Sequence, residues 1–479
     1  MFYGRNYYIN LLEELLKKPL SSVVTCRGRR RVGKSTLFEE FARRNGCRFL
    51  KLEGRAPGDG VGDREQREAF GLQLAEQSPL PRLTPEDWPQ AFKLLDSVLF
   101  ERPEWTVLLL DKISWMGGSS KTFASDLKIA WDNHLKKHDR LIMVICGSVS
   151  SWVTENFVES TGFVGRRSYD FILPELPLEE AVGFWKDVRE RRTSREILDV
   201  LSVTGGVPRY LEEIDPSLSA DDNIRRLGFL RKAVLREDFD EMFTDVITRQ
   251  TRLSGAVLRS LVHGSKTVSE IASAIGVSRG GDLSGALSQL MESGLVSGQA
   301  GKNPKTGEDL RIVRYRIRDN YARFYLRYLE PVKDMIDADS YQFSGLEQFS
   351  GWETDLGFQF ENLVLNNFRQ ILKPLHLENV LVKSAAPYAK KGSRKTGEKG
   401  VQIDLLVQTN MALCLVEIKR KSRIGREVIE DMKEKCARLP RPKDMAVRTA
   451  LVYEGELDRS VEADGYFDAI IPFRVLLGL

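Results

Sequence analysis

The sequence predicts an α/β protein of several domains, on three observations. Over residues 1–172 short apolar runs alternate with amphipathic segments, which is typical of a parallel sheet wound with helices. The same pattern returns near the C-terminus, and much of the stretch between has the apolar period of helices. A chain of 479 residues also exceeds what one hydrophobic core usually organises, so we expect three or four domains.

The elements follow in order. In the first domain, residues 1–172, we predict strands at 22–26, 107–110 and 141–146. Residues 173–250 have apolar residues at helical spacing, which predicts a helical lid with helices at 178–192 and 194–203. Residues 251–335 predict a winged helix-turn-helix with helices at 267–278 and 281–296, a hairpin turn at 303–309 and a strand at 311–317. Residues 336–479 predict a second α/β domain with a helix at 358–372 and strands at 401–408 and 412–419.

Composition and charge narrow the class of protein. No apolar run reaches the length of a bilayer span and no segment resembles a signal peptide, so we expect a cytoplasmic protein with no membrane partner. Five cysteines and four histidines show no metal-ligand spacing, which argues against a zinc site. The formal net charge of +4 neither requires nor excludes nucleic acid.

A phosphate-binding loop is the strongest motif. Residues 28–35, "GRRRVGKS", fit the pattern G-x-x-x-x-G-K-[ST] between a predicted strand and a predicted helix. The glycines let backbone N–H groups point at phosphates, Lys34 can bridge the β- and γ-phosphates, and the Ser35 hydroxyl can bind Mg²⁺. The arginines at 29–31 can touch the nucleotide, or face solvent or a partner. The predicted ATP-binding residues of the loop are Gly28, Arg31, Val32, Gly33, Lys34, Ser35 and Thr36.

A second acidic element ends an apolar strand at Asp111, where a carboxylate can hold a magnesium-bound water opposite Ser35. The next residue in ATPases of this type is normally a glutamate that polarises the attacking water, but here it is Lys112. An ammonium cannot act as that base, and beside the metal it would compete for the γ-phosphate. Three explanations stay open: slow hydrolysis, a substitution introduced to trap the bound state, or another carboxylate in the role.

Further polar residues recur in a recognisable order. Ser148 ends a buried strand, Arg166 and Arg167 lie in a loop, and Arg209 begins a helix. With "FYGR", the phosphate loop and "LLLD", these residues resemble the archaeal ATPase family of AAA+-class ATPases over residues 2–215. The resemblance implies a P-loop AAA+-like fold, Arg5 near the adenine, Ser148 as first sensor and Arg209 as lid residue. It implies Arg166 as a finger toward a neighbouring subunit, and hence a homo-oligomer through the ATPase domain.

Charged residues inside apolar strands mark the last domain. Asp404 lies in one strand, and Glu417 and Lys419 share a face of the next because side chains alternate along a strand. Charges in such places require a partner or a metal. Asp404 and Glu417 can bind a divalent ion that Glu361 supports, with Lys419 orienting the attacking water. The alternative is a structural Glu–Lys ion pair.

The resemblance extends into this domain. Residues 314–329, "RYRIRDNYARFYLRYL", follow the predicted winged helix and resemble the entry to a C-terminal domain that accompanies the family and is similar to PD-(D/E)XK nucleases. Basic side chains flank the carboxylates and fit DNA, although such runs also suit a solvated loop. They are Lys383, Lys390, Lys391, Arg394, Lys395, Lys399, Arg420, Lys421, Arg423 and Arg426.

The predicted winged helix fits DNA or a protein partner. Its second helix has little positive charge beyond Arg279, and the wing carries Lys302, Lys305 and Arg311. Our leading hypothesis is an ATPase that binds ATP and Mg²⁺ and is coupled through the winged helix to a metal-dependent nuclease-like domain acting on DNA. The alternatives are an ATP-controlled signalling or assembly switch, and a DNA-tethering ATPase without nuclease activity.

Overall fold

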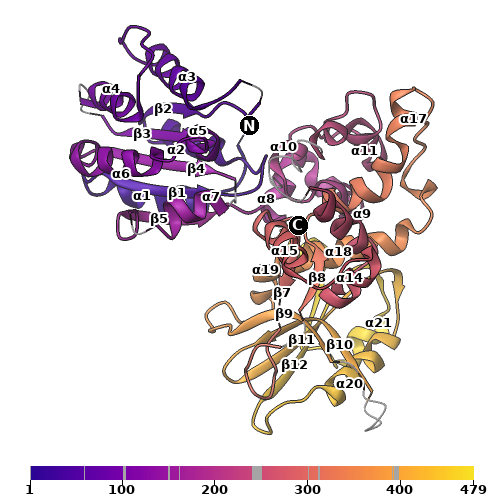
Figure 1. Cartoon of the computed structure of the whole chain (residues 1–479). Coiled ribbons are helices and arrows are strands. Elements are labelled where there is room, and N and C mark those ends of the chain that lie inside the picture. Colours follow the sequence, from indigo (N-terminus) through magenta and orange to yellow (C-terminus); the bar gives the residue numbers. More distant parts are fainter. Residues whose placement is uncertain are drawn as a thin grey trace. The chain divides into compact units, whose positions relative to one another are not determined.

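The structure divides into two compact units (Figure 1). It is a computed structural model that describes all residues except 1, 59, 101–103, 149–150, 161, 240–250, 300, 311–312, 391 and 393–398. The first unit comprises residues 1–176 with 292–294, and the second comprises residues 177–291 and 295–479. Most of the predicted lid and winged helix-turn-helix, and all of the predicted C-terminal domain, therefore fall in the second unit.

The first unit contains a parallel sheet in the order β2-β3-β4-β1-β5. The predicted strands at 22–26, 107–110 and 141–146 are confirmed as β1, β3 and β4, because both faces of these strands are buried and read as continuous apolar runs. The strands are β1 (Ser22–Arg27), β2 (Arg48–Glu53), β3 (Thr106–Asp111), β4 (Leu141–Gly147) and β5 (Arg167–Ile172).

Helices cover both faces of this sheet, so a binding site is expected at the edge where the strands have their carboxyl ends. On one face α1 (Asn6–Leu16) and α2 (Lys34–Arg44) pack against alternate strand residues. On the other face lie α3 (Asp63–Glu76), α4 (Trp88–Phe100), α5 (Ile113–Gly117) and α6 (Phe123–Asn133). Because the strands are parallel, the ends of β1, β2, β3 and β4 meet at one edge.

The second unit begins with helices. They are α8 (Leu178–Ala181), a 3₁₀ segment at Val182–Arg191, α9 (Ser194–Thr204), α10 (Pro208–Leu211) and α11 (Ala220–Gly228). The predicted continuous helix over 178–192 is wrong, because Lys186 interrupts it with φ 52° and ψ −132°. The helix at 194–203 is confirmed as α9, which begins at a capping box between Thr193 and Glu196.

Three helices and a small antiparallel sheet follow. The helices are α13 (Thr251–Leu261), α14 (Val268–Ile275) and α15 (Gly281–Glu292). The sheet has the order β6-β8-β7, with β6 (Lys266–Thr267), β7 (Val296–Gln299) and β8 (Arg314–Ile317). The turn predicted after α14 is present, with Gly276 in the left-handed conformation at φ 70°. Arg311 of the predicted wing lies outside the described residues.

Short helices α16 (Asn320–Phe324), α17 (Lys333–Asp337) and α19 (Phe368–Leu372) and the longer α18 (Trp352–Asn366) precede the last sheet in the chain, and α18 packs against it. Its order is β13-β12-β11-β10-β9, with β11, β12 and β13 parallel and β9 and β10 antiparallel. The strands are β9 (Ser384–Lys390), β10 (Val401–Gln408), β11 (Ala412–Ile424), β12 (Ala446–Leu457) and β13 (Ala469–Pro472).

The basic segment before Asp404 is predicted as a loop. In the structure its first part, residues 384–390, forms the edge strand β9. The amphipathic α20 (Glu427–Arg438) buries Val428, Ile429 and Met432 in the core under this sheet. Two short helices, α21 (Arg459–Asp464) and α22 (Phe473–Leu476), complete the unit. Among the residues that the structure describes, no helix combines the length and apolarity that crossing a bilayer requires.

Candidate functional site

The phosphate loop connects β1 to α2 and has the backbone that its glycines predict. Arg31 and Gly33 adopt positive φ angles of 69° and 82°, which turn successive N–H groups toward one side. At Gly28 a Cβ would come 2.7 Å from the Leu173 carbonyl oxygen, so only glycine fits there. The Lys34 Nζ donates to the carbonyl oxygens of Gly28 and of Arg29, both at 2.9 Å. The lysine that we assign to phosphate therefore lies against its own loop.

Around that loop Val32 is buried and Thr36, in the first turn of α2, is exposed. Arg5 is also buried, and its Nη2 donates to the carbonyl oxygens of Val32 at 3.0 Å and of Pro174 at 2.7 Å. Arg5 thus braces the loop through its backbone, whereas the role that we predict for it is beside the adenine. Arg29 is 8% exposed and binds Glu175 at 2.9 Å, so it does not face solvent.

A hydroxyl and a carboxylate meet where we predict magnesium. The Ser35 Oγ donates to Asp111 Oδ2 at 2.5 Å, and Asp111 is only 5% exposed. The Lys51 Nζ lies 3.6 Å from the same carboxylate oxygen. Oxygen donors of this kind are those that Mg²⁺ prefers, and the ammonium shows that the position accepts a cation. The residues present therefore fit the ion.

Lys112 follows Asp111 but points to a neighbouring strand. Its Nζ lies 2.6 Å from Glu53 Oε1 and 4.5 Å from the centre of the Trp115 ring. Glu53 ends β2 directly beside Asp111, and its second oxygen lies 2.6 Å from the Lys51 Nζ. Burial opposes ionisation of Glu53, but hydrogen bonds from Lys112 and Lys51 outweigh it and lower the pKa of this carboxyl.

Glu53 was missed by the sequence analysis. A lone carboxylate at the end of a half-buried strand was the available signal, and nothing in the sequence shows that this strand lies beside β3.

The remaining predicted nucleotide residues are Ser148, Arg166 and Arg209. Ser148 directly follows β4, which lies between β3 and β1, and is half-buried. The Arg166 Nε and Nη2 donate to the two carboxylate oxygens of Asp132 at 2.8 and 3.0 Å, so Arg166 would have to leave Asp132 to act in another subunit. Arg209 belongs to the second unit, where its Nη1 lies 2.5 Å from Glu213 Oε1.

The charged strand residues of the last domain lie together. The antiparallel register of β10 and β11 places Asp404 opposite Glu417, and Asp404 Oδ2 accepts a hydrogen bond from the Ile418 N–H at 2.9 Å. Glu417 is 1% exposed and is paired with Lys419 at 2.8 Å and with Lys435 of α20. Lys435 has no signal in the sequence, because helix packing alone brings it to Glu417.

Electrostatics couple three carboxylates in this cluster. Burial, then the charges of Glu417 and Glu361, raise the pKa of Asp404 to about 7. Burial also raises the pKa of Glu361 on α18, against the opposing charges of Arg316 and Arg323. In the described ranges, however, no group of three or more His, Cys, Asp or Glu side chains is placed to hold a metal ion. Metal binding by Asp404 and Glu417 stays a prediction.

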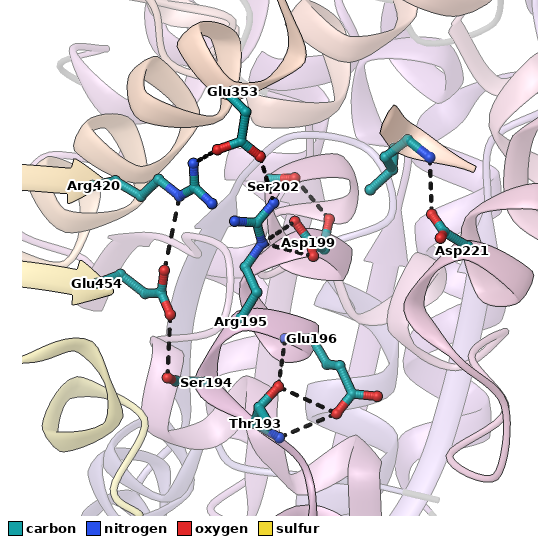
Figure 2. Close-up of polar contacts among 11 residues, drawn as sticks. Thr193, Ser194, Arg195, Glu196, Asp199, Ser202, Asp221, Glu353, Arg420 and Glu454 are labelled. Carbon is teal, nitrogen blue, oxygen red and sulfur yellow. Dashed lines mark hydrogen bonds and ion pairs between the residues drawn. The ribbon is translucent and has the colours of Figure 1, made fainter. Parts of the chain in front are cut away.

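The basic residues expected to track phosphates are in part paired. Arg420 is buried and binds Glu353 and Glu454, so it is placed neither to follow phosphates, as we predict, nor in a solvated loop (Figure 2). Arg423 and Arg426 lie on the surface and are paired with Asp458 and Asp464. Lys391, Arg394 and Lys395 lie outside the described residues.

Arg420 belongs to a network that joins α9 to the C-terminal sheet. Arg195 of α9 contacts Asp199 and, at 2.9 Å, Glu353 of α18 (Figure 2). Glu353 in turn binds Arg420 of β11, whose Nε lies 3.8 Å from Glu454 of β12. The network therefore connects a helix of the predicted lid to two strands of the predicted nuclease-like domain.

Comparison with known proteins identifies the first part of the chain. Residues 2–214 match the sequence profile of an ATPase domain found predominantly in Archaea. An uncharacterized protein of Methanocaldococcus jannaschii is 22% identical over 441 residues, which cover 89% of each chain. The structure of a Walker-type ATPase of Pyrococcus abyssi is similar at a TM-score of 0.50 and 16% identity, over 68% of this chain and 96% of that one. The ORC2 protein of Aeropyrum pernix, in complexes with ADPNP and ADP, has a TM-score of 0.43 and 15% identity, over 70% and 93% of the two chains.

Residues 2–214 are therefore an ATPase domain of the archaeal type, with the parallel α/β sheet of P-loop ATPases. The resemblance drawn from the motifs is confirmed for this part as an ATPase domain, whereas the assignment of individual loop residues to ATP stays a prediction. The profile ends before the segment of α13–α15 and before the C-terminal sheet.

Proposed function

We propose that this chain binds and hydrolyses ATP with Mg²⁺ and that the nucleotide state controls a nuclease-like C-terminal domain acting on DNA. The observation that carries the ATPase half is the convergence of Lys34, Ser35 and Asp111 at one end of the parallel sheet. The three helices and the antiparallel sheet of residues 251–317 support a winged helix, which in the sequence lies between the ATPase domain and the nuclease-like domain.

The loop residues divide the work of binding. Lys34 exchanges the carbonyl oxygens of Gly28 and Arg29 for the β- and γ-phosphate oxygens, because charge-assisted bonds to phosphate are stronger than those to carbonyls. Ser35 and Asp111 would hold Mg²⁺, which would supply positive charge for the phosphates. The N–H groups of the loop and of the first turn of α2 can donate to the phosphates, and the positive end of the α2 dipole lies beside them.

Glu53 takes the role that Lys112 cannot. Its carboxylate ends the strand beside Asp111, and two lysines keep it ionised and so able to accept a proton from the attacking water. The Lys112 ammonium contacts Glu53 and the Trp115 ring. In this arrangement Lys112 does not compete with Mg²⁺ for the γ-phosphate. Of the three open explanations, we therefore favour another carboxylate.

Phosphate release by the Glu53→Gln variant tests this assignment. General-base catalysis is typically worth about 10²–10⁴-fold, so we expect hydrolysis to fall by that factor while ATP binding persists. Glu76→Gln, an exposed glutamate on α3, is the matched control and should hydrolyse at the parent rate. Unchanged hydrolysis in Glu53→Gln would remove Glu53 as the base.

The nuclease-like activity rests on the carboxylate cluster. Asp404 and Glu417 face each other on adjacent strands, and the ammonium groups of Lys419 and Lys435 at Glu417 mark a place that accepts positive charge. We propose that Asp404 and Glu417 hold a divalent ion, that Glu361 supports it, and that Lys419 orients the attacking water. A bound divalent ion would activate that water and neutralise charge on the phosphate.

Incubation of plasmid DNA with the full chain and Mg²⁺ or Mn²⁺ tests this half. We expect cleavage in the parent and in the exposed control Glu427→Gln, and none in Asp404→Asn or Glu417→Gln. The pairing of Glu417 with two lysines favours a second candidate, a DNA-tethering ATPase that does not cut. An ATP-sensitive gel shift without cleavage would establish that candidate, and neither binding nor cleavage would favour an ATP-controlled assembly switch.

Control by nucleotide is supported by the contacts of α9. This helix lies within the archaeal-type ATPase domain and is tied to β11 and β12 through Arg195, Glu353 and Arg420 (Figure 2). A nucleotide that moves α9 would move the C-terminal sheet with it. We therefore expect ATP to change DNA binding in the parent and to have no effect in Lys34→Ala; DNA binding that ignores ATP in both would contradict control by nucleotide.

A further inference from the structure

A cavity of about 90 Å³ separates the small β6-β8-β7 sheet from the C-terminal sheet. One water needs only about 10–15 Å³ of such space, so the cavity has room for a larger group. Its walls come from both sheets and from α18. The residues that matter here are Arg314 and Arg316 of β8, Glu361 of α18, Tyr388 of β9, and Gln402 and Asp404 of β10.

Arg316, which lines this cavity, has a donor N–H without a partner among the described residues. Its Nη2 donates to Asn366 Oδ1 at 3.1 Å, but its Nη1 is buried and has no hydrogen-bond partner in the part of the chain that the structure describes. Burial lowers the pKa of Arg316 to about 9, so the guanidinium remains charged at neutral pH. Buried guanidinium groups normally have their N–H groups satisfied by acceptors, so this side chain requires one more acceptor.

The nearby charges indicate which acceptor fits. Glu361 lies close enough to Arg316 for each to change the pKa of the other, but the structure records no ion pair between them. Arg314 is already engaged, with its Nε 3.1 Å from Ser265 Oγ. Arg316 therefore has a donor N–H left for a group that binds in the cavity. Arginine guanidinium groups bind the oxygens of phosphate and of carboxylate, and the action on DNA proposed above favours phosphate.

We infer that this cavity is a phosphate-binding site, in which Arg316 holds a phosphate group of a nucleic-acid strand beside Asp404 and Glu361. The site is composite, because a strand of the predicted winged helix completes a pocket of the nuclease-like domain. The inference rests on the proposed action on DNA, but it requires neither cleavage nor a bound metal. Inorganic phosphate shares the recognised chemistry and serves as the second probe.

Binding of a short fluorescent DNA oligonucleotide, measured in EDTA without nucleotide, tests the site. All proteins carry Lys34→Ala, so that the phosphate loop does not contribute. Losing a hydrogen bond to a charged group predicts about tenfold or weaker binding for Arg316→Met. Arg318→Met, an exposed arginine two residues further along, is the matched control and should bind within about twofold of the parent.

A second measurement separates the sources of the phosphate. Inorganic phosphate should raise the unfolding temperature of the Lys34→Ala parent but not that of Arg316→Met, and it should displace the oligonucleotide. Arg316→Lys keeps the charge without the fork, so a folded Arg316→Lys with reduced affinity supports the assignment even if Arg316→Met fails to fold. Equal binding by the parent and both variants would overturn it, as would a parent that neither probe affects, since the cavity would then hold water only. Loss of plasmid cleavage alone does not bear on this test, because no divalent ion is present.

Discussion

Asp199 shows how burial sets the chemistry of a single residue. Its side chain on α9 is 14% exposed and lies 2.9 Å from the Arg195 Nε. Burial raises the pKa of Asp199 to about 6, with Arg195 opposing the shift. In the unfolded chain the carboxyl titrates near its ordinary value of 3.8. Between these two values the folded protein binds the proton that the unfolded chain has lost, so folding becomes less favourable as pH rises.

We therefore predict that Asp199→Asn gains stability relative to the parent as pH rises. Well below pH 3.8 the carboxyl is protonated in both states and contributes little difference. Above pH 6 the cost of the buried charge is complete, up to about 3 kcal/mol. Denaturant unfolding of both proteins at pH 4, 5, 6 and 7 measures the difference. Asp334→Asn, an exposed carboxyl on α17, should show no such trend, and a flat difference for Asp199→Asn would contradict the prediction.

The residues of the two sites differ in how far the sequence could predict them. Gly28 to Ser35 are contiguous, and one turn of backbone makes the binding geometry, so a pattern finds them. Glu53, Arg316 and Lys435 reach their sites from strands and a helix that only the tertiary fold brings alongside. For the same reason the sequence shows that Lys112 follows Asp111 but does not show that its side chain contacts Glu53.

Among the elements, the segment at 182–191 departs most from its pattern. Its apolar residues recur at helical spacing, but Lys186 adopts φ 52° and ψ −132°, a conformation that glycine tolerates and other residues do not. The strand β9 departs in the other direction. Its lysines and Pro387 are typical of a loop, yet an edge strand accommodates proline and charge because one side of its backbone is unpaired.

The conformation of Lys186 leads to a second prediction. Lys186→Gly should raise the free energy of unfolding by about 1 kcal/mol, because glycine removes the strain between Cβ and the backbone. Lys186→Ala keeps the Cβ and should give no gain, which makes it the matched control for loss of this exposed side chain. Chemical denaturation of the three proteins is the measurement, and a destabilised Lys186→Gly would contradict the expected strain.

The network between α9 and the C-terminal sheet gives a third prediction. Arg420→Met removes the guanidinium 3.8 Å from the buried Glu454 and should cost about 3–5 kcal/mol. Arg420→Met with Glu454→Met removes both charges and should recover most of that loss. Glu353 is 63% exposed, so Glu353→Gln should cost less than about 1 kcal/mol. The unfolding free energies of the parent, Arg420→Met, Glu454→Met and the double variant form a double-mutant cycle, and a double variant as unstable as Arg420→Met would contradict the network.

At the scale of the whole molecule, the end of the ATPase domain that sequence similarity defines differs from the end of the first compact unit. The archaeal-type ATPase domain extends to residue 214, whereas the first compact unit ends at residue 176. Helices α8, α9 and α10 therefore belong to the ATPase domain by sequence and share a compact unit with the C-terminal sheet. This overlap is the physical basis that we propose for transmitting the nucleotide state. It could not be predicted from the sequence, because long-range packing and not local pattern decides which core a helix joins.

The central claim is that the loop between β1 and α2 binds ATP. Titration calorimetry of the full chain with ATP and Mg²⁺ tests it most directly. We predict saturable binding in the parent and in Lys17→Ala, an exposed lysine at the end of α1, and at least about tenfold weaker binding in Lys34→Ala. Absence of binding heat in the parent, or equal binding in Lys34→Ala, would contradict the claim.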